Sequence, residues 1–228
     1  MLKHSSLIKT GYAVVFALLL SGCMHKIRPL PYDAWSLDFF APDYMEVWIE
    51  TADVVDINDR VFWRAGGGIP AMAYPRGMSK GVPSEFRGKP AGWPEEPGGK
   101  GRYVTGADLP RLVYVRWQSL AEPQTYHAFI EIPESVRQQM AKREEVFCAF
   151  NGKVITQYRK LLVVGLAPGG IAKVWVEGPC LTAIEVTRVQ GKIHSKGPYE
   201  GQSGGAYYPL LEESKAYIEK FGIPYGSW

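Results

Sequence analysis

The chain has 228 residues, of which 46% are hydrophobic and 21% are charged, and its formal net charge is +3. This supply of apolar residues is enough for a packed core and argues against global disorder. The near-neutral balance provides no concentrated basic face, so the composition argues against a nucleic-acid partner. The length suits one domain of generous size or two small ones.

The first 22 residues have the pattern of a secretory signal. A basic start with Lys3 and Lys9 precedes the apolar run Ala13–Leu20, and small residues follow it. The run is too short to cross a bilayer, because a spanning helix needs about 20 apolar residues. We therefore expect residues 1–22 to be removed from the mature protein.

The end of this segment, Leu20-Ser21-Gly22-Cys23, resembles the lipobox of bacterial lipoproteins. That resemblance implies that Cys23 becomes the first mature residue and carries lipid on its thiol. Several acyl chains give stable anchoring where one would not. An ordinary signal peptide before a chance cysteine is the alternative. Residues 23–31 then form a lipidated tether. Met24 stands where inner-membrane retention usually shows Asp, which predicts the outer membrane facing the periplasm.

Residues 32–228 are predicted to form a single β-rich domain. Apolar residues alternate with polar ones in short runs that are bounded by turn residues, which is typical of strands and hairpins. The turn Asn58-Asp59 predicts one such hairpin. The expected strands cover residues 35–40, 45–50, 53–57, 61–63, 112–117, 125–132, 161–166, 171–177 and 183–189. In the strand 171–177, Trp175 is expected on the half-exposed face with Lys173 and Glu177.

The segment 66–110 interrupts this pattern with 11 glycines and 7 prolines. That density of breakers predicts a long loop without strand or helix of any length. Its aromatic residues favour packing on the protein's own sheet. The alternative is a recognition surface, because Tyr and Trp on Gly-rich loops suit partner binding and Arg is common at tight interfaces. The candidate partner contacts are Phe86, Trp93, Arg102 and Tyr103.

Two helices complete the predicted fold. Pro133 suits a first helical position and opens a short mid-chain helix that is expected to run to about Glu144. A C-terminal helix is indicated by an apolar stripe from Leu210 to Phe221, with Gly222 as its C-cap. The predicted class is α+β, mostly antiparallel β in a sandwich-like or open sheet, with a short mid-chain helix and a C-terminal helix.

Two cysteines, Cys148 and Cys180, remain after lipidation. The envelope outside the inner membrane is oxidising and permits a disulfide. In the chain-entropy model such a bond stabilises by about 3–4 kcal/mol. Two buried free thiols are the alternative. With no histidine partners nearby the pair does not suggest a metal site, and no cofactor is predicted.

The sequence contains only weak catalytic motifs. Gly201-Gln202-Ser203-Gly204-Gly205 matches G-x-S-x-G, but no strand precedes it and neither Asp nor His follows Ser203. The histidines His25, His127 and His194 lack metal-ligand spacing. His127 is expected to be structural within a strand, and His194 to be solvated. No catalytic residue and no metal ligand are predicted.

Several segments together resemble an uncharacterised family of proteobacterial lipoproteins that carries a domain of unknown function. They are Ala107–Pro110, Val115–Leu120, Val164–Gly170 and Gly222–Trp228. The resemblance covers nearly all of the mature chain and brings no catalytic residues with it. Some members resemble immunity proteins that accompany secreted antibacterial lipase effectors.

We therefore expect a lipid-anchored cell-envelope binding protein without catalytic activity, and more specifically an immunity protein that neutralises a secreted antibacterial lipase. Its expected partners are the membrane, through the anchor at Cys23, and a lipase-type effector. One alternative is an envelope hydrolase acting through Ser203. The other is a structural lipoprotein with no dedicated partner.

Overall fold

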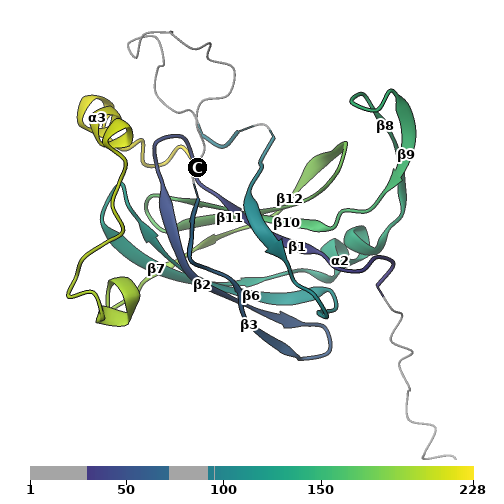
Figure 1. Ribbon diagram of the computed structural model, residues 1–228, viewed down its shortest axis with the longest axis horizontal. Coiled ribbons are helices and arrows are strands. Elements are labelled where there is room, and N and C mark those ends of the chain that lie inside the picture. Colours follow the sequence, from purple (N-terminus) through teal and green to yellow (C-terminus); the bar gives the residue numbers. More distant parts are fainter. Residues whose placement is uncertain (1–29, 72–91, 95) are drawn as a thin grey trace, which may run out of the picture.

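The computed structural model describes residues 30–71, 92–94 and 96–228 (Figure 1). The predicted signal segment, Cys23, His25 and Phe86 lie outside the described residues. The described chain forms two main sheets and a separate hairpin. The first sheet has the strand order β12 (Leu181–Gln190), β11 (Ile171–Gly178), β10 (Leu161–Ala167), β1 (Ser36–Phe40) and β5 (Lys100–Tyr103).

The second sheet lies against the first. Its order is β13 (Lys192–Ile193), β7 (Gln124–Glu131), β6 (Pro110–Ser119), β2 (Val47–Asp56) and β3 (Val61–Gly66), and β4 (Ile69–Ala71) also pairs with β2. The pairing of β1 with β10 is parallel, whereas the other pairings among the described strands are antiparallel. The predicted class, α+β with mostly antiparallel sheets, is confirmed.

The core lies between the two sheets. Alternate residues of β2, such as Ile49 and Val54, point inward with Trp117 of β6 and meet Phe39 and Leu162 of the first sheet. All five are at most 1% exposed. The regions predicted as two strands, 45–50 and 53–57, form the single strand β2, whose register shifts between Ile49 and Thr51. Because a bulge changes the alternation, the sequence pattern divides this strand in two.

The outer face of the first sheet is also covered. Trp175 of β11 is 6% exposed and packs against Phe40 and Trp93 with ring centroids 5.5 and 5.4 Å apart. Trp228 lies 6.4 Å from Trp93 and continues this layer. The prediction of a half-exposed face at Trp175 was therefore wrong. Residues distant in sequence cover that strand, and periodicity within the strand carries no information about them.

The helices are α2 (Glu134–Ala141), α3 (Glu212–Phe221) and a short 3₁₀ turn at Pro198–Gly201. Gly222 ends α3 with φ of 73° and donates its N–H to the Ile218 carbonyl over 2.7 Å, which confirms the predicted C-cap. Within the described residues no helix is long and apolar enough to span a membrane.

The mid-chain helix is shorter than predicted. Glu144 begins the strand β8 (Glu144–Cys148), which pairs with β9 (Lys153–Gln157) in a hairpin that the sequence analysis missed. The charged residues on both sides of residue 144 resemble a helix end as much as a strand start. Cys148 and Cys180 form a disulfide with their Cα atoms 5.2 Å apart, as one of the two alternatives predicted.

The described parts of the predicted loop 66–110 contain two short strands, β4 and β5. Glycine itself permits the second one. A Cβ at Gly101 would collide with the Leu37 carbonyl oxygen, so only glycine allows β5 to approach β1 this closely. Glycines that indicate a loop can thus also mark a close backbone approach inside a sheet.

Candidate functional site: an arginine pocket beside an apolar groove

The outer face of the second sheet is only half covered. The segment from His194 to Tyr208 crosses it and is held there by a buried carboxylate, Glu50. Glu50 accepts hydrogen bonds from Arg116 Nε at 2.6 Å, from Gln118 Nε2 at 2.8 Å and from the Tyr199 N–H at 2.7 Å. Arg116 also pairs with Glu200. The uncovered half carries two adjoining cavities, which share Asp53 and Trp63.

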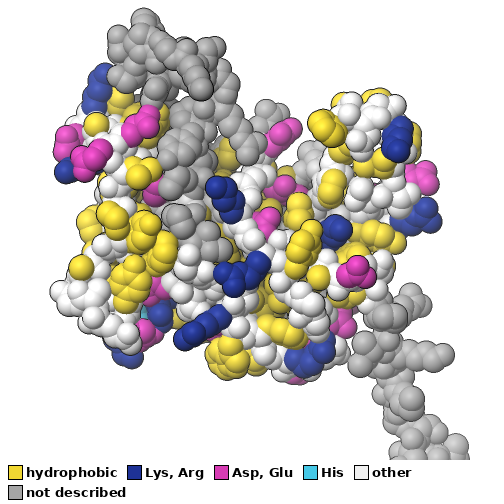
Figure 2. Space-filling view, in the orientation of Figure 1, with side chains coloured by type: hydrophobic (Ala, Val, Ile, Leu, Met, Phe, Trp, Pro, Cys, Tyr) yellow, Lys and Arg dark blue, Asp and Glu magenta, His cyan; other side chains and the backbone are white. Residues whose placement is uncertain are grey.

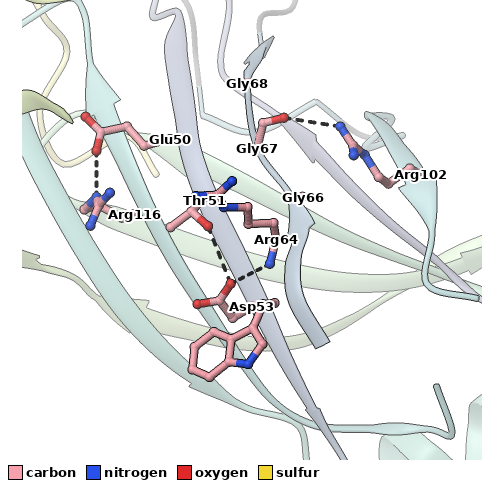
Figure 3. Close-up of a pocket in the computed structure, with 10 residues that line it drawn as sticks. Glu50, Thr51, Asp53, Arg64, Gly66, Gly67, Gly68, Arg102 and Arg116 are labelled. Atoms are coloured by element: carbon pink, nitrogen blue, oxygen red, sulfur yellow. Dashed lines mark hydrogen bonds and ion pairs between the residues drawn. The ribbon is translucent and has the colours of Figure 1, made fainter. Parts of the chain in front are cut away.

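The first cavity, the arginine pocket, has a volume of about 630 Å³. It collects side chains from four strands, as Figure 3 shows. β2 contributes Glu50 and Asp53, β6 contributes Arg116, β3 contributes Arg64 and β5 contributes Arg102. Its remaining lining residues are Thr51, Trp63 and Gly66, Gly67 and Gly68.

The backbone around Arg64 is unusual. Arg64 has φ of 54°, in the left-handed region that non-glycine residues rarely occupy. Its N–H is held by Asp53 Oδ1 at 2.8 Å. Gly67 has φ of 141°, and a Cβ there would lie 2.8 Å from the Glu50 carbonyl oxygen, so this position requires glycine. Strained residues of this kind cluster at binding and catalytic sites, which makes the pocket a functional candidate.

The three arginines differ in their electrostatic state. Glu50 and Glu200 neutralise Arg116, whose side chain is 14% exposed. Within the described part of the chain, no carboxylate lies within ion-pair distance of Arg64 or Arg102. Arg102 donates from Nη2 to the Gly67 carbonyl over 3.4 Å (Figure 3). The pocket therefore offers two guanidinium groups to an incoming anion. Figure 2 shows basic side chains gathered in front of β2, β3 and β5.

The second cavity, the apolar groove, has a volume of about 460 Å³. Its walls are aliphatic and aromatic side chains on the outward positions of β2, β3, β6 and β7. Trp63 and Phe129 are 75% and 62% exposed. The lining residues are Asp53, Val55, Val61, Trp63, Leu112, Tyr114, His127, Phe129 and His194. A mostly apolar cleft with a few polar groups at one end is typical of a binding site.

Two histidines, His127 and His194, line the groove. Their rings are 5.5 Å apart and perpendicular, and His127 also packs near Tyr114 and Phe129. The side chain of His194 is only 15% exposed, so the prediction of a solvated His194 was wrong. Burial lowers the pKa of His194, and the nearby Arg116 and His127 lower it further. The lowered pKa favours the neutral imidazole, which forms part of the wall of the groove.

The residues predicted as partner contacts lie in different parts of the structure. Arg102 lines the arginine pocket, whereas Tyr103 is 59% exposed and points to the opposite side of β5. Trp93 packs in the aromatic layer over the first sheet, in line with the favoured reading that loop aromatics cover the protein's own sheet. Ser203 donates to the Pro198 carbonyl over 3.4 Å, within its own turn.

Three site residues, Trp63, Arg64 and Arg116, were not predicted from the sequence. Each lies in a predicted or extended strand, and an outward aromatic or arginine on a strand resembles ordinary surface. The one available signal was the glycine triplet Gly66–Gly68 directly after Trp63 and Arg64. In the parts of the chain that the structure covers, His, Cys, Asp and Glu form no group of three able to hold a metal ion.

Comparison with known proteins places the chain in a family. The model of a family of proteins of unknown function, DUF2931, matches residues 22–226. The chain belongs to this family. The match covers the whole described structure except its last two residues, so both cavities of this DUF2931 protein lie within the family region. No curated protein and no solved structure matches the chain.

Proposed function

We propose that the protein is a lipid-anchored binding protein of the bacterial cell envelope, without catalytic activity, that binds a partner protein through the arginine pocket and the apolar groove. One observation carries this proposal. Trp63, which is 75% exposed, lines both cavities, and the first of them also holds Arg64 and Arg102, which have no carboxylate within ion-pair distance among the described residues. Trp and Arg dominate the energetics of protein interfaces, and here they adjoin pre-formed concave surfaces.

The chemistry of the two cavities defines the partner surface. A carboxylate on the partner would pair with Arg64 and Arg102, and a guanidinium can hold a carboxylate through two parallel hydrogen bonds. Apolar side chains beside that carboxylate would fill the groove against Trp63 and Phe129. The partner should therefore present an acidic residue next to an apolar or aromatic one.

The resemblance to immunity proteins supports a secreted antibacterial lipase as this partner. An immunity protein anchored through Cys23 to the outer membrane, facing the periplasm, would stand where such an effector acts. Binding through the two cavities would then neutralise the lipase by occlusion.

The test is inhibition of a secreted phospholipase of the same bacterium, measured on a soluble ester substrate with the mature protein in molar excess. We expect inhibition by the wild type, and about 30-fold weaker inhibition by Trp63→Ala and by Arg64→Ala, since interface hot spots are worth about 2 kcal/mol or more. Phe150→Ala is the matched control, because Phe150 is 96% exposed and lines neither cavity. Undiminished lipase activity in excess wild-type protein would contradict the effector assignment.

A further inference from the structure

The β8–β9 hairpin exposes apolar side chains away from both cavities. Phe147 and Val154 are directly paired across the two strands, and each is 62% exposed. Phe150, in the turn between the strands, is 96% exposed. Figure 1 shows the hairpin projecting from the two sheets, and Figure 2 shows hydrophobic side chains on the same lobe. Three large apolar side chains on one projecting element are unusual for a surface that faces only water.

The hairpin is held firmly in this exposed position. A two-stranded hairpin alone is marginally stable in water. Here the disulfide joins Cys148, at the end of β8, to Cys180 in the connection between β11 and β12. At the base, Arg159 is 6% exposed and pairs with Glu144 at 2.8 Å. The fold therefore fixes the apolar tip outward.

The chain enters the domain at the base of this hairpin. The ring of Tyr32 packs on that of Tyr158, the residue directly after β9, with centroids 5.4 Å apart. Cys23 precedes Leu30 by seven residues. Seven residues span at most about 25 Å when extended. The strands of the hairpin, five residues each, are about 17 Å long. A lipid on Cys23 and the tip of the hairpin can thus reach one membrane surface together.

The charges near the apolar tip suit an anionic membrane. Lys142, Arg143 and Lys153 are exposed on or beside the hairpin, against the single exposed acid Glu145. Glu144 is already paired with Arg159. Basic side chains around exposed aromatic ones favour the interface of a bilayer that contains anionic phospholipid.

We propose that the β8–β9 hairpin is a second membrane contact, which inserts Phe147, Phe150 and Val154 into the interface of the bilayer that holds the lipid anchor. This inference rests on the anchor at Cys23 that is part of the proposed function. The contact would fix the orientation of the domain on the membrane, because two attachment points remove the free rotation that a single tether allows.

The test uses the mature lipidated protein in vesicles of phosphatidylethanolamine and phosphatidylglycerol, with hydrogen exchange as the measurement. The reference is the mature chain with Cys23→Ala in solution. We expect the backbone amides of residues 149–152 to exchange about tenfold more slowly in the vesicle-bound protein. In lipidated Phe147→Ser/Phe150→Ser this protection should vanish. Lipidated Phe129→Ser is the matched control, because Phe129 is also 62% exposed but belongs to the groove.

The outcomes separate the two proposals. Vesicle flotation reports the anchor, and a lipidated protein that does not float would overturn both the anchor and this contact. A protein that floats while its hairpin amides exchange at the solution rate would overturn the contact alone. If the hairpin amides are protected from exchange in concentrated Cys23→Ala protein without vesicles, the tip binds a second copy of the chain. That result would also overturn the membrane contact.

Discussion

The outer face of each sheet carries a tryptophan, but one tryptophan is buried and the other is exposed. On the first sheet, Trp175 is 6% exposed beneath Trp93 and Trp228. On the second sheet, Trp63 is 75% exposed between two cavities. Strand alternation places both tryptophans outward, but covering segments far along the chain decide which one is buried. The covered face serves stability, and the uncovered face is available for recognition.

The sharpest test of this contrast replaces one tryptophan on each face. Trp175→Ala removes a large buried ring from the layer over the first sheet and should cost about 3–5 kcal/mol of unfolding free energy. In a chain of this size that corresponds to a fall in Tm of about 6–20 °C. Urea denaturation followed by circular dichroism measures the free energy directly.

Trp63→Ala is the matched control for that experiment. The exposed ring should change the unfolding free energy by no more than about 0.5 kcal/mol. Equal losses in the two variants would show that Trp63 is a packing residue, and the contrast between the faces would then fail.

The disulfide between Cys148 and Cys180 is expected to stabilise the β8–β9 hairpin beside the first sheet. Replacing both cysteines, Cys148→Ser/Cys180→Ser, opens a closed loop with a sequence separation of 32. The chain-entropy model gives a loss of about 3–4 kcal/mol. We expect this loss of unfolding free energy in denaturant melts of the double variant and, to the same extent, in wild-type protein treated with a reductant. The same reductant should leave the unfolding free energy of the double variant unchanged, which shows that it acts through this disulfide. An unaltered melt after verified reduction would contradict the prediction.

The partial cover of the second sheet depends on the pair between Arg116 and Glu50. Arg116→Met keeps the length of the side chain and leaves Glu50, whose side chain is 2% exposed, without its charged partner. We expect a loss of about 2–3 kcal/mol, since an unpaired buried charge is costly. Amide exchange in residues 198–204 should accelerate, because Glu50 also holds the Tyr199 N–H.

Arg111→Met on the same strand is the control for this variant. Arg111 pairs with Asp59, and the two side chains are 51% and 79% exposed. An exposed pair contributes at most about 1 kcal/mol, so this change should be nearly neutral. If the two arginine variants lose equal stability, the buried pair is not what holds the covering segment.

The sequence alone predicted much of the fold, for physical reasons that are visible in particular elements. β7 and β10 have strong apolar patterns bounded by turns, and both were placed within one residue of their observed limits. The hairpin β8–β9 was missed because its exposed Phe147 and Val154 and its charged flanks give no buried face to detect. A strand whose apolar side chains point to solvent does not show the alternation that burial imposes.

The site was far less predictable than the fold. Arg102 was a candidate contact, yet its pocket forms only because β2, β3, β5 and β6 meet in space. The left-handed backbone of Arg64 follows from the register shift between β2 and β3 near Asp53, which no local pattern of residues encodes. The arginine pocket lies between strands of the two sheets, so it depends on tertiary packing that residue spacing along the chain does not report.

The smallest expected effect concerns Glu46, a buried carboxylate that directly precedes β2 and contacts α3. Glu46 is 2% exposed, and Ser214 of α3 donates a hydrogen bond to its Oε1, while its Oε2 has no hydrogen-bond partner among the described residues. Burial raises the pKa of Glu46, and the hydrogen bond from Ser214 only partly offsets this. The folded state therefore binds the proton more tightly than the unfolded chain does.

The sign of the pH dependence follows from linkage. Between the ordinary glutamate pKa of about 4.3 and the raised pKa of the folded state, the carboxyl is ionised in the unfolded chain but still protonated in the folded one. The free energy of unfolding of the wild type therefore falls as the pH rises through this window. Glu46→Gln keeps an acceptor for Ser214 and carries no charge, so it should melt at a higher temperature than the wild type at pH 7.5. The two melting temperatures should converge near pH 4. Glu131→Gln, at an exposed position on β7, is the control for the loss of one negative charge. If Glu46→Gln melts below the wild type at pH 7.5, then the charge of Glu46 stabilises the contact between β2 and α3, and the raised pKa is not what governs the stability of the fold here.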